Sequence, residues 1–163
     1  MNELVVIAHN LRSTHNVGSL LRTAEGLGVR TVYLTGYTPY PLSTSDGRIP
    51  HQAGKIDKQI KKTALGAETS QSWQQGDINA VIEDLHDQGF VIAGLEQTPE
   101  AINLNEYQPA AKLAIILGRE VEGIEKSVLN LTDLQLVIPM FGKKESFNVV
   151  QAAAMALYHC RFT

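Results

Sequence analysis

The stretch "LRSTHNVGSLLRTAEGLGV", residues 11–29, has the pattern of a helix that covers one face of a sheet. At about 100° per residue, its apolar side chains fall on one side of the helix. The residues on that side are Val17, Leu20, Leu21, Ala24, Leu27 and Gly28. Arg22 falls on the opposite side, next to small residues such as Gly18 and Ser19 that let another backbone or a ligand come close. A solvated surface charge is the usual explanation of such an arginine.

Around this helix, short aliphatic runs alternate with helical patterns along the whole chain. Strands are expected at 4–8, 31–35, 90–95, 113–117 and 134–138. Helices are expected at 17–28, 55–64, 78–87, 124–130 and 147–159. Strands that alternate with helices predict an α/β fold with a parallel sheet covered on both faces. Residues 36–50 contain three prolines and two glycines and have no apolar period, which predicts a long exposed loop.

Length and composition limit the possible classes of protein. A chain of 163 residues that is 44% hydrophobic predicts one domain over residues 1–163. The acidic Glu3 and the short apolar run 4–8 fit neither a secretory signal nor a membrane span, so a cytoplasmic protein without a membrane partner is expected. The single cysteine, Cys160, cannot form an intramolecular disulfide, and the histidines lack metal-ligand spacing. We therefore expect no metal site.

Charge is distributed unevenly along the chain. Residues 1–62 hold eight basic residues (Lys or Arg) and four acidic ones (Asp or Glu). Residues 63–111 hold no basic and eight acidic residues, and residues 112–163 hold six basic and five acidic residues. The middle part is therefore expected to lie away from any polyanion. The segment "RIPHQAGKIDKQIKK", residues 48–62, has five basic side chains and one acid. A solvated helix face and a phosphate-binding patch explain that cluster equally well.

Common nucleotide and hydrolase motifs do not occur in the sequence. No G-x-G-x-x-G follows the first strand, no P-loop motif is present, and Ser146 lacks the flanking glycines of a nucleophile elbow. In "IILGREVEGI", residues 115–124, a strand runs directly into a glycine-rich turn. That turn is either a ligand site at the carboxyl end of a strand or only a tight connection.

The last motif is "VIPMFGKKESFNVVQAAAMALYHC", residues 137–160, which contains a strand, a glycine turn and a helix. Ser146 is suited to be the N-cap of this helix. Asn148 has no helical advantage in the first turn, so it either caps the helix or contacts a ligand. Ala152, Ala153 and Ala156 leave one side of the helix thin, which predicts that something packs closely against it.

Taken together, "NVGSLLRTAEGLGV" (16–29), "ILGREVEGI" (116–124) and "IPMFGKKESFNVVQAAAMALY" (138–158) resemble the three ordered motifs of the SpoU (TrmH-like) branch of the SPOUT RNA methyltransferases. The resemblance implies a parallel sheet with a C-terminal deep trefoil knot and no separate RNA-binding extension. It also implies a homodimer that transfers a methyl group from S-adenosylmethionine to a ribose 2′-hydroxyl of tRNA or rRNA, with tRNA slightly preferred. A catalytically silent RNA-binding or assembly module of the same fold is the alternative.

The resemblance also assigns roles to individual residues. The catalytic residues would be Asn16, Arg22, Glu120, Ser146 and Asn148. The cofactor would lie against Leu95, Glu96, Gly118, Ile138, Met140 and Phe147. RNA would contact Arg12, Arg48, Lys55, Lys143 and Lys144. Because a guanidinium rarely loses its proton near neutrality, Arg22 would clamp a phosphate and stabilise the developing alkoxide rather than act as a base.

Overall fold

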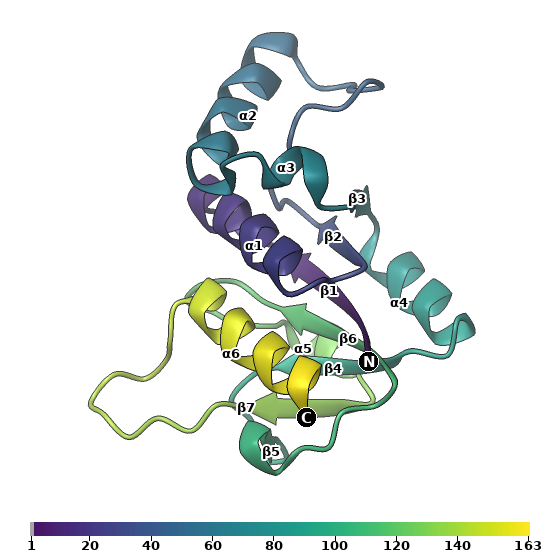
Figure 1. Ribbon diagram of the computed structural model, residues 1–163, viewed down its shortest axis with the longest axis vertical. Helices are drawn as coiled ribbons and strands as arrows, with labels where there is room; N and C mark the ends of the chain where they lie inside the picture. The colour runs from purple at the N-terminus through teal and green to yellow at the C-terminus, as the bar shows by residue number, and fades with distance from the viewer. Residues whose placement is uncertain (1) are drawn as a thin grey trace.

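A seven-stranded sheet with the strand order β3-β2-β1-β6-β4-β7-β5 forms the centre of the computed structural model, which describes residues 2–163 (Figure 1). Every pair of neighbouring strands is parallel. The strands are β1 (Glu3–His9), β2 (Thr31–Thr35), β3 (Trp73–Gly76), β4 (Val91–Leu95), β5 (Ile102–Asn103), β6 (Lys112–Leu117) and β7 (Leu134–Val137). The expected parallel α/β fold is confirmed. Strand order does not determine whether the chain is threaded through a loop, so the trefoil knot stays a prediction.

Helices cover both faces of this sheet. They are α1 (Thr14–Gly26), α2 (Pro50–Ala64), α3 (Ala67–Ser70), α4 (Ile78–Asp87), α5 (Lys126–Leu129) and α6 (Val149–Phe162), with a 3₁₀ turn at Leu104–Glu106. One apolar cluster joins the sheet to α1, α2 and α6, and a second joins it to α4 and α5. Strand β1 supplies both, because Val6 packs in the first cluster whereas Val5 and Ile7 pack in the second. This alternation is that of a strand buried on both faces.

Two strands were not expected from the sequence. Strand β3 has the polar sequence WQQG and pairs only with β2, at one edge of the sheet. Strand β5 has two residues and pairs only with β7, at the other edge. An edge strand needs neither a continuous apolar run nor much length, so hydrophobic patterning misses it.

Several helix boundaries differ from the sequence-based expectation. Helix α2 begins at Pro50 rather than at residue 55, with proline in the first turn, so the exposed loop ends at residue 49. Proline is favoured there because its missing N–H has no partner inside a helix. The helix expected at 124–130 is reduced to the single turn of α5. Helix α1 begins three residues earlier than expected, at Thr14, and Ser13 caps it by accepting a hydrogen bond from the Asn16 N–H.

The expectation that Ser146 caps the last helix was wrong. Asn148 is the N-cap of α6, and its side-chain oxygen accepts a hydrogen bond from the Val150 N–H at 2.9 Å. Ser146 and Phe147 precede the helix in an exposed turn. Asparagine and serine are comparable caps, so side-chain preference alone could not distinguish the two positions.

The alanines of α6 pack inside the chain. Ala153 and Ala156 are almost completely buried and belong to the cluster that contains α1. The close packing that these small residues predicted is therefore packing against the chain's own core. Two aromatic side chains, Tyr158 and Phe162, are instead exposed and lie with their ring centroids 4.8 Å apart.

Gly18 allows α1 and α2 to pack in close contact, side by side as Figure 1 shows. A Cβ added at Gly18 would lie 2.2 Å from the backbone oxygen of Ile60 and 2.2 Å from Oγ1 of Thr63. The Thr63 hydroxyl donates a hydrogen bond to the backbone oxygen of His15 at 2.8 Å. The small residue predicted to admit another backbone thus admits α2.

We expect Gly18→Ala to lower the free energy of unfolding by about 1–3 kcal/mol, because the methyl group would push two helices apart. Gly54→Ala is the matched control, since Gly54 lies inside α2 and nothing lies within 4 Å of its Cβ position. The control should gain about 0.5–1 kcal/mol from helix propensity. Urea unfolding measures both, and an equal gain for the two variants would contradict the close contact.

Candidate active site

A cavity of about 240 Å³ lies at the carboxyl ends of β4, β6 and β7. Its walls come from the loops that follow these strands and from the first turns of α6. The lining residues are Leu95, Glu96, Gln97, Leu117, Gly118, Arg119, Glu120, Val121, Gly123, Leu136, Val137, Ile138, Glu145, Ser146, Phe147, Val149 and Ala152. Open parallel sheets bind ligands at this edge. Aliphatic side chains form most of one wall, and charged side chains border the opening, as in many small-ligand sites.

Hydrogen bonds hold the loops of the cavity to one another. The carboxylate of Glu96 accepts a hydrogen bond from the Ile124 N–H at 2.7 Å, which joins the end of β4 to the loop after β6. The side-chain amide of Gln97 donates to the backbone oxygen of Glu145 at 2.6 Å, which joins the same strand to the loop after β7. These hydrogen bonds therefore fix the loops after β4, β6 and β7 relative to one another.

Gly118 lets the loop after β6 fold back on itself. Arg119 and Gly123 exchange two backbone hydrogen bonds of 3.1 Å, and a Cβ on Gly118 would lie 2.4 Å from the Ile124 nitrogen. Gly123 has a φ of 73°, a conformation that L side chains rarely adopt. The glycines of "GREVEG" thus make the tight connection that one explanation expected, and the turn also lines the cavity. That it binds a ligand stays a prediction.

Glu120 anchors this turn to the loop before α1. Its carboxylate accepts hydrogen bonds from the backbone N–H groups of Arg12 and Ser13, each at 3.2 Å, and from the side-chain amide of Asn16 at 3.3 Å. Partial burial pushes the pKa of Glu120 up, but hydrogen bonds from backbone N–H groups and from Asn16 outweigh burial. The pKa of Glu120 therefore lies below its ordinary value, and the carboxylate is ionised near neutrality.

Asn16 connects Glu120 to the start of α6. Its side-chain oxygen accepts a hydrogen bond from the side-chain amide of Asn148 at 3.3 Å. The amide groups of Asn16 and Asn148 thus link residues 132 positions apart in the chain. Three of the predicted catalytic residues, Asn16, Glu120 and Asn148, form one chain of contacts at the rim of the cavity, and Ser146 lines the cavity beside them.

Arg22 lies apart from this group. It is exposed on α1 and does not line the cavity, and its side chain makes no hydrogen bond or ion pair with any of residues 2–163. By the rise of an α-helix, it lies about 9 Å further along the axis than Asn16. Its guanidinium is therefore free to contact a bound molecule or a second copy of the chain.

The predicted cofactor-binding residues mostly line the cavity. Leu95, Glu96, Gly118, Ile138 and Phe147 line it, whereas Met140 does not. The Glu96 carboxylate, however, is already used by backbone N–H groups. The sequence analysis did not assign Gln97, Arg119, Val149 or Ala152, which also line the cavity. Arg119 was visible as a charge directly after a buried strand, a position where ligand-binding residues commonly occur.

Arg119 has an unusual environment for an arginine. Its Nε atom is buried and has no hydrogen-bond partner among the residues that the structure describes. An unpaired buried donor costs free energy. Nearby, the buried imidazole of His9 bonds the Thr35 hydroxyl at 2.9 Å, and burial, more than the charge of Arg119, lowers the pKa of His9.

The predicted RNA-binding residues lie in four places. Arg12 is exposed beside the cavity and pairs with Glu122 at 3.4 Å, and Lys143 and Lys144 are exposed in the loop after β7. Lys55 is exposed on α2. Arg48 is instead bound inside the loop before α2, by the carboxylate of Asp46 and by backbone oxygens.

Residues 2–163 contain neither a membrane-spanning helix nor a cluster of metal-binding side chains. No helix in that range is long and apolar enough to cross a bilayer. No group of three or more His, Cys, Asp or Glu side chains in the same range is arranged to hold a metal ion. The metal-free site expected from the sequence stays a prediction.

The fold and this cavity define a class of protein, and comparison with known families identifies it. The model of the SpoU rRNA Methylase family matches residues 3–158, and the chain belongs to this family. It is 28% identical, over 98% of its length, to the tRNA (guanosine(18)-2′-O)-methyltransferase of Escherichia coli K12. It spans 63% of the length of that relative.

Solved structures show the same fold. The SpoU methyltransferase AviRb of Streptomyces viridochromogenes, in complex with AdoMet, matches 98% of this chain with a TM-score of 0.81 and 20% identity, over 57% of its own chain. A protein solved in a study of the 2-OH methylation of C/U34 on tRNA matches 98% of this chain with a TM-score of 0.79 and 22% identity. The match covers 94% of that protein, so chains of nearly this length also adopt the fold.

We expect the contribution of Glu120 to stability to depend on pH. Because its pKa in the folded state is lower than the ordinary 4.5, the ionised carboxylate stabilises the fold above about pH 4.5. This stabilisation is lost as the pH falls through the lower, folded-state pKa. The difference in unfolding free energy between the wild type and Glu120→Gln should therefore be largest near neutrality and shrink in acid.

Urea unfolding over a pH series measures this difference. Glu122→Gln is the control, because it removes an exposed carboxylate two positions away that pairs only with Arg12 among the described residues. If the difference in unfolding free energy between the wild type and Glu120→Gln stays constant from neutral pH into acid, the ionised carboxylate of Glu120 does not stabilise the fold.

Proposed function

We propose that this protein transfers a methyl group from S-adenosylmethionine to a ribose 2′-hydroxyl of RNA, with tRNA preferred over rRNA. The observation that carries the proposal is that the three family motifs meet at one end of the sheet. Residues of the second and third motifs line the cavity, and Asn16 of the first contacts Glu120 and Asn148. Membership in the SpoU rRNA Methylase family and the activity in the name of the Escherichia coli relative support it.

The cavity suits the proposed cofactor. Leu95, Leu117, Leu136 and Ile138 offer an apolar wall, and Arg119 brings a positive charge to the lining that suits a carboxylate. S-adenosylmethionine, when bound, supplies a methyl group activated by the positive charge of its sulfur. No metal is needed for such a transfer, so the chain's own residues have to align the oxygen and stabilise charge.

In the proposed mechanism, the residues at the rim position the ribose and Arg22 supplies positive charge. Asn16 and Asn148 are held by one another and by Glu120, so their side chains have little freedom. Ser146 stands at the opening of the cavity, where its hydroxyl can bond the sugar. Arg22 would bind the adjacent phosphate and stabilise the oxygen as its proton passes to solvent water, since a guanidinium stays charged at neutral pH and does not accept that proton.

The proposal includes a homodimer and a cytoplasmic location. Tyr158 and Phe162 are 62% and 69% exposed on α6, and a groove beside them is lined by Ala154, Met155 and His159. Apolar side chains exposed together commonly mark an interface. A second copy seated on α6 would cover them and would bring another exposed Arg22 near the assembled sites.

Titration calorimetry with S-adenosylmethionine tests the cofactor directly. We expect the wild type to bind, and Ala152→Leu to bind at least about tenfold more weakly, because the added side chain would occupy the cavity that Ala152 lines. Gln151→Leu is the matched control, because Gln151 is exposed on the adjacent position of α6 and outside the cavity. No heat with the wild type would favour a catalytically silent module.

Arg22→Ala should lower the rate of methyl transfer by about 10²–10³-fold, the usual effect of removing a group that stabilises developing charge. Its affinity for S-adenosylmethionine should stay unchanged, because Arg22 does not line the cavity. Arg30→Ala is the control, since Arg30 is exposed and pairs with Glu3 at 2.6 Å. Mapping of 2′-O-methyl groups in total RNA, with and without each variant, measures the activity. An Arg22→Ala protein with normal turnover would disprove the assignment.

A further inference from the structure

Helix α2 has one side that carries only cationic or titratable side chains. His51, Lys55, Lys58 and Lys62 recur at intervals of four, three and four residues, and all four are exposed. We call them the α2 stripe. The buried residues of the helix lie on the opposite side and are Ala53, Asp57, Ile60 and Ala64. From His51 to Lys62 the stripe is about 16 Å long.

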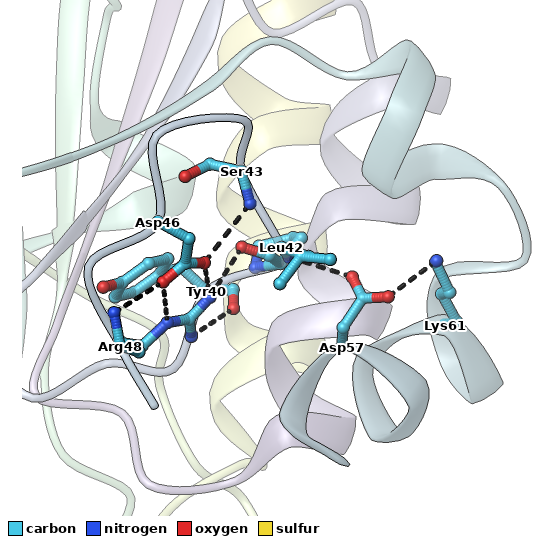
Figure 2. Close-up of polar contacts among 8 residues, drawn as sticks. Tyr40, Leu42, Ser43, Asp46, Arg48, Asp57 and Lys61 are labelled. Carbon is cyan, nitrogen blue, oxygen red and sulfur yellow. Dashed lines mark hydrogen bonds and ion pairs between the residues drawn. The ribbon is translucent and has the colours of Figure 1, made fainter. Parts of the chain in front are cut away.

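The other two basic residues of the same segment are bound within the chain. Lys61 pairs with Asp57 at 2.6 Å. The guanidinium of Arg48 lies 3.6 Å from the ring centre of Tyr40, pairs with Asp46 and donates to the backbone oxygens of Tyr40 and Pro41 (Figure 2). Within residues 2–163, by contrast, Lys55, Lys58 and Lys62 form no ion pair. The segment thus has two structural cations, Arg48 and Lys61, which are bound within the chain, and three free ones, Lys55, Lys58 and Lys62.

The structural cations hold the preceding loop against α2. Besides pairing with Lys61, Asp57 accepts a hydrogen bond from the Leu42 N–H at 2.9 Å (Figure 2). Asp46 accepts a hydrogen bond from the Ser43 N–H at 3.3 Å. The side chain of Arg48 lowers the pKa of Asp46 well below its usual range, so this contact persists under all ordinary conditions. The helix that carries the α2 stripe is therefore fixed in place before any ligand arrives, which reduces the entropy lost on binding.

The α2 stripe ends close to the candidate active site. Thr14 and His15, in the first turn of α1, contact Gln59 and Thr63 of α2 through hydrogen bonds of 3.3 and 2.8 Å. The next residue, Asn16, belongs to the rim of the cavity. Lys62 is adjacent to Thr63, so the stripe runs along α2 toward the turn that carries Asn16.

Helix α4, which carries three of the acidic residues in the middle part of the chain, lies on the other side of the sheet (Figure 1). It packs in the cluster that excludes α1, α2 and α6, and it exposes Glu83, Asp84 and Asp87. A polyanion is therefore repelled from the α4 face and attracted to the α2 face. The apolar residues of α2 itself pack against the protein, which is unlike a helix that inserts its apolar side into a lipid surface.

We propose that the α2 stripe binds the phosphate backbone of the RNA substrate and guides the strand to the cavity. This inference rests on the proposed function, since it assigns an RNA-binding surface to the same site. The binding is electrostatic and independent of base sequence, because free ammonium groups contact phosphates rather than base edges. It adds Lys58 and Lys62 to the RNA contacts and removes Arg48 from them.

Binding of bulk tRNA over a series of salt concentrations tests the inference. We expect the triple variant Lys55→Ala/Lys58→Ala/Lys62→Ala to bind at least about tenfold more weakly, and its plot of log affinity against log salt to lose about two units of slope. The matched single variants are Lys58→Ala and Lys61→Ala, which remove the same charge from the same helix three positions apart. Lys58→Ala should weaken binding several-fold, whereas Lys61→Ala should leave the salt slope unchanged.

Calorimetry with S-adenosylmethionine on each variant shows that the cavity and the fold are intact. A triple variant that binds tRNA with the affinity and salt slope of the wild type would overturn the inference and leave the proposed function standing. Loss of binding to vesicles of anionic phospholipid, with RNA binding unchanged, would overturn it in favour of a lipid surface. A wild type that binds no RNA would instead overturn the proposed function.

Discussion

The carboxylate of Glu120 is the contact on which the arrangement of the site depends. It joins the turn after β6 to the loop before α1, and through Asn16 it reaches Asn148 at the start of α6. Backbone N–H groups at the start of a helix have no partner inside the helix, so a carboxylate placed there is well solvated by them. The same hydrogen bonds satisfy a helix end, keep a charge ionised and bring together segments that are distant in the chain.

Close backbone approaches make that arrangement possible. Gly118 leaves room for the returning turn, and Gly18 leaves room for α2 against α1. A third close contact lies at Gly36, where a Cβ would overlap the side-chain oxygen of Asn10. Asn10 has a φ of 58°, donates to Glu125 at 2.9 Å and accepts from the Tyr37 N–H at 3.0 Å. Through these hydrogen bonds of its side chain, Asn10 connects the loop before α2 to the start of α5.

The distribution of charge follows the layers of the fold. Helix α4 exposes Glu83, Asp84 and Asp87 on one side of the sheet, while the free lysines of α2 and the exposed Arg22 of α1 lie on the side of the other apolar cluster. A molecule with a net charge of −3 can in this way present a positive face to a polyanion. Arg48 and Lys61 show that a basic residue in this region is not automatically part of that face, because each is neutralised by a partner within four residues.

The sequence by itself determined the layers of the fold and identified seven of the 17 residues that line the cavity. Buried parallel strands leave continuous aliphatic runs, and the glycines of residues 116–124 mark a turn at a strand end, so both could be found from local pattern. Tertiary structure alone decided that Asn148 rather than Ser146 caps α6, that Ala153 and Ala156 are buried in the chain's own core, and that Arg48 is an internal contact. Each of these depends on which groups meet across more than one element, and the local sequence of a capping or charged residue is the same whether its partner is water, backbone or another side chain.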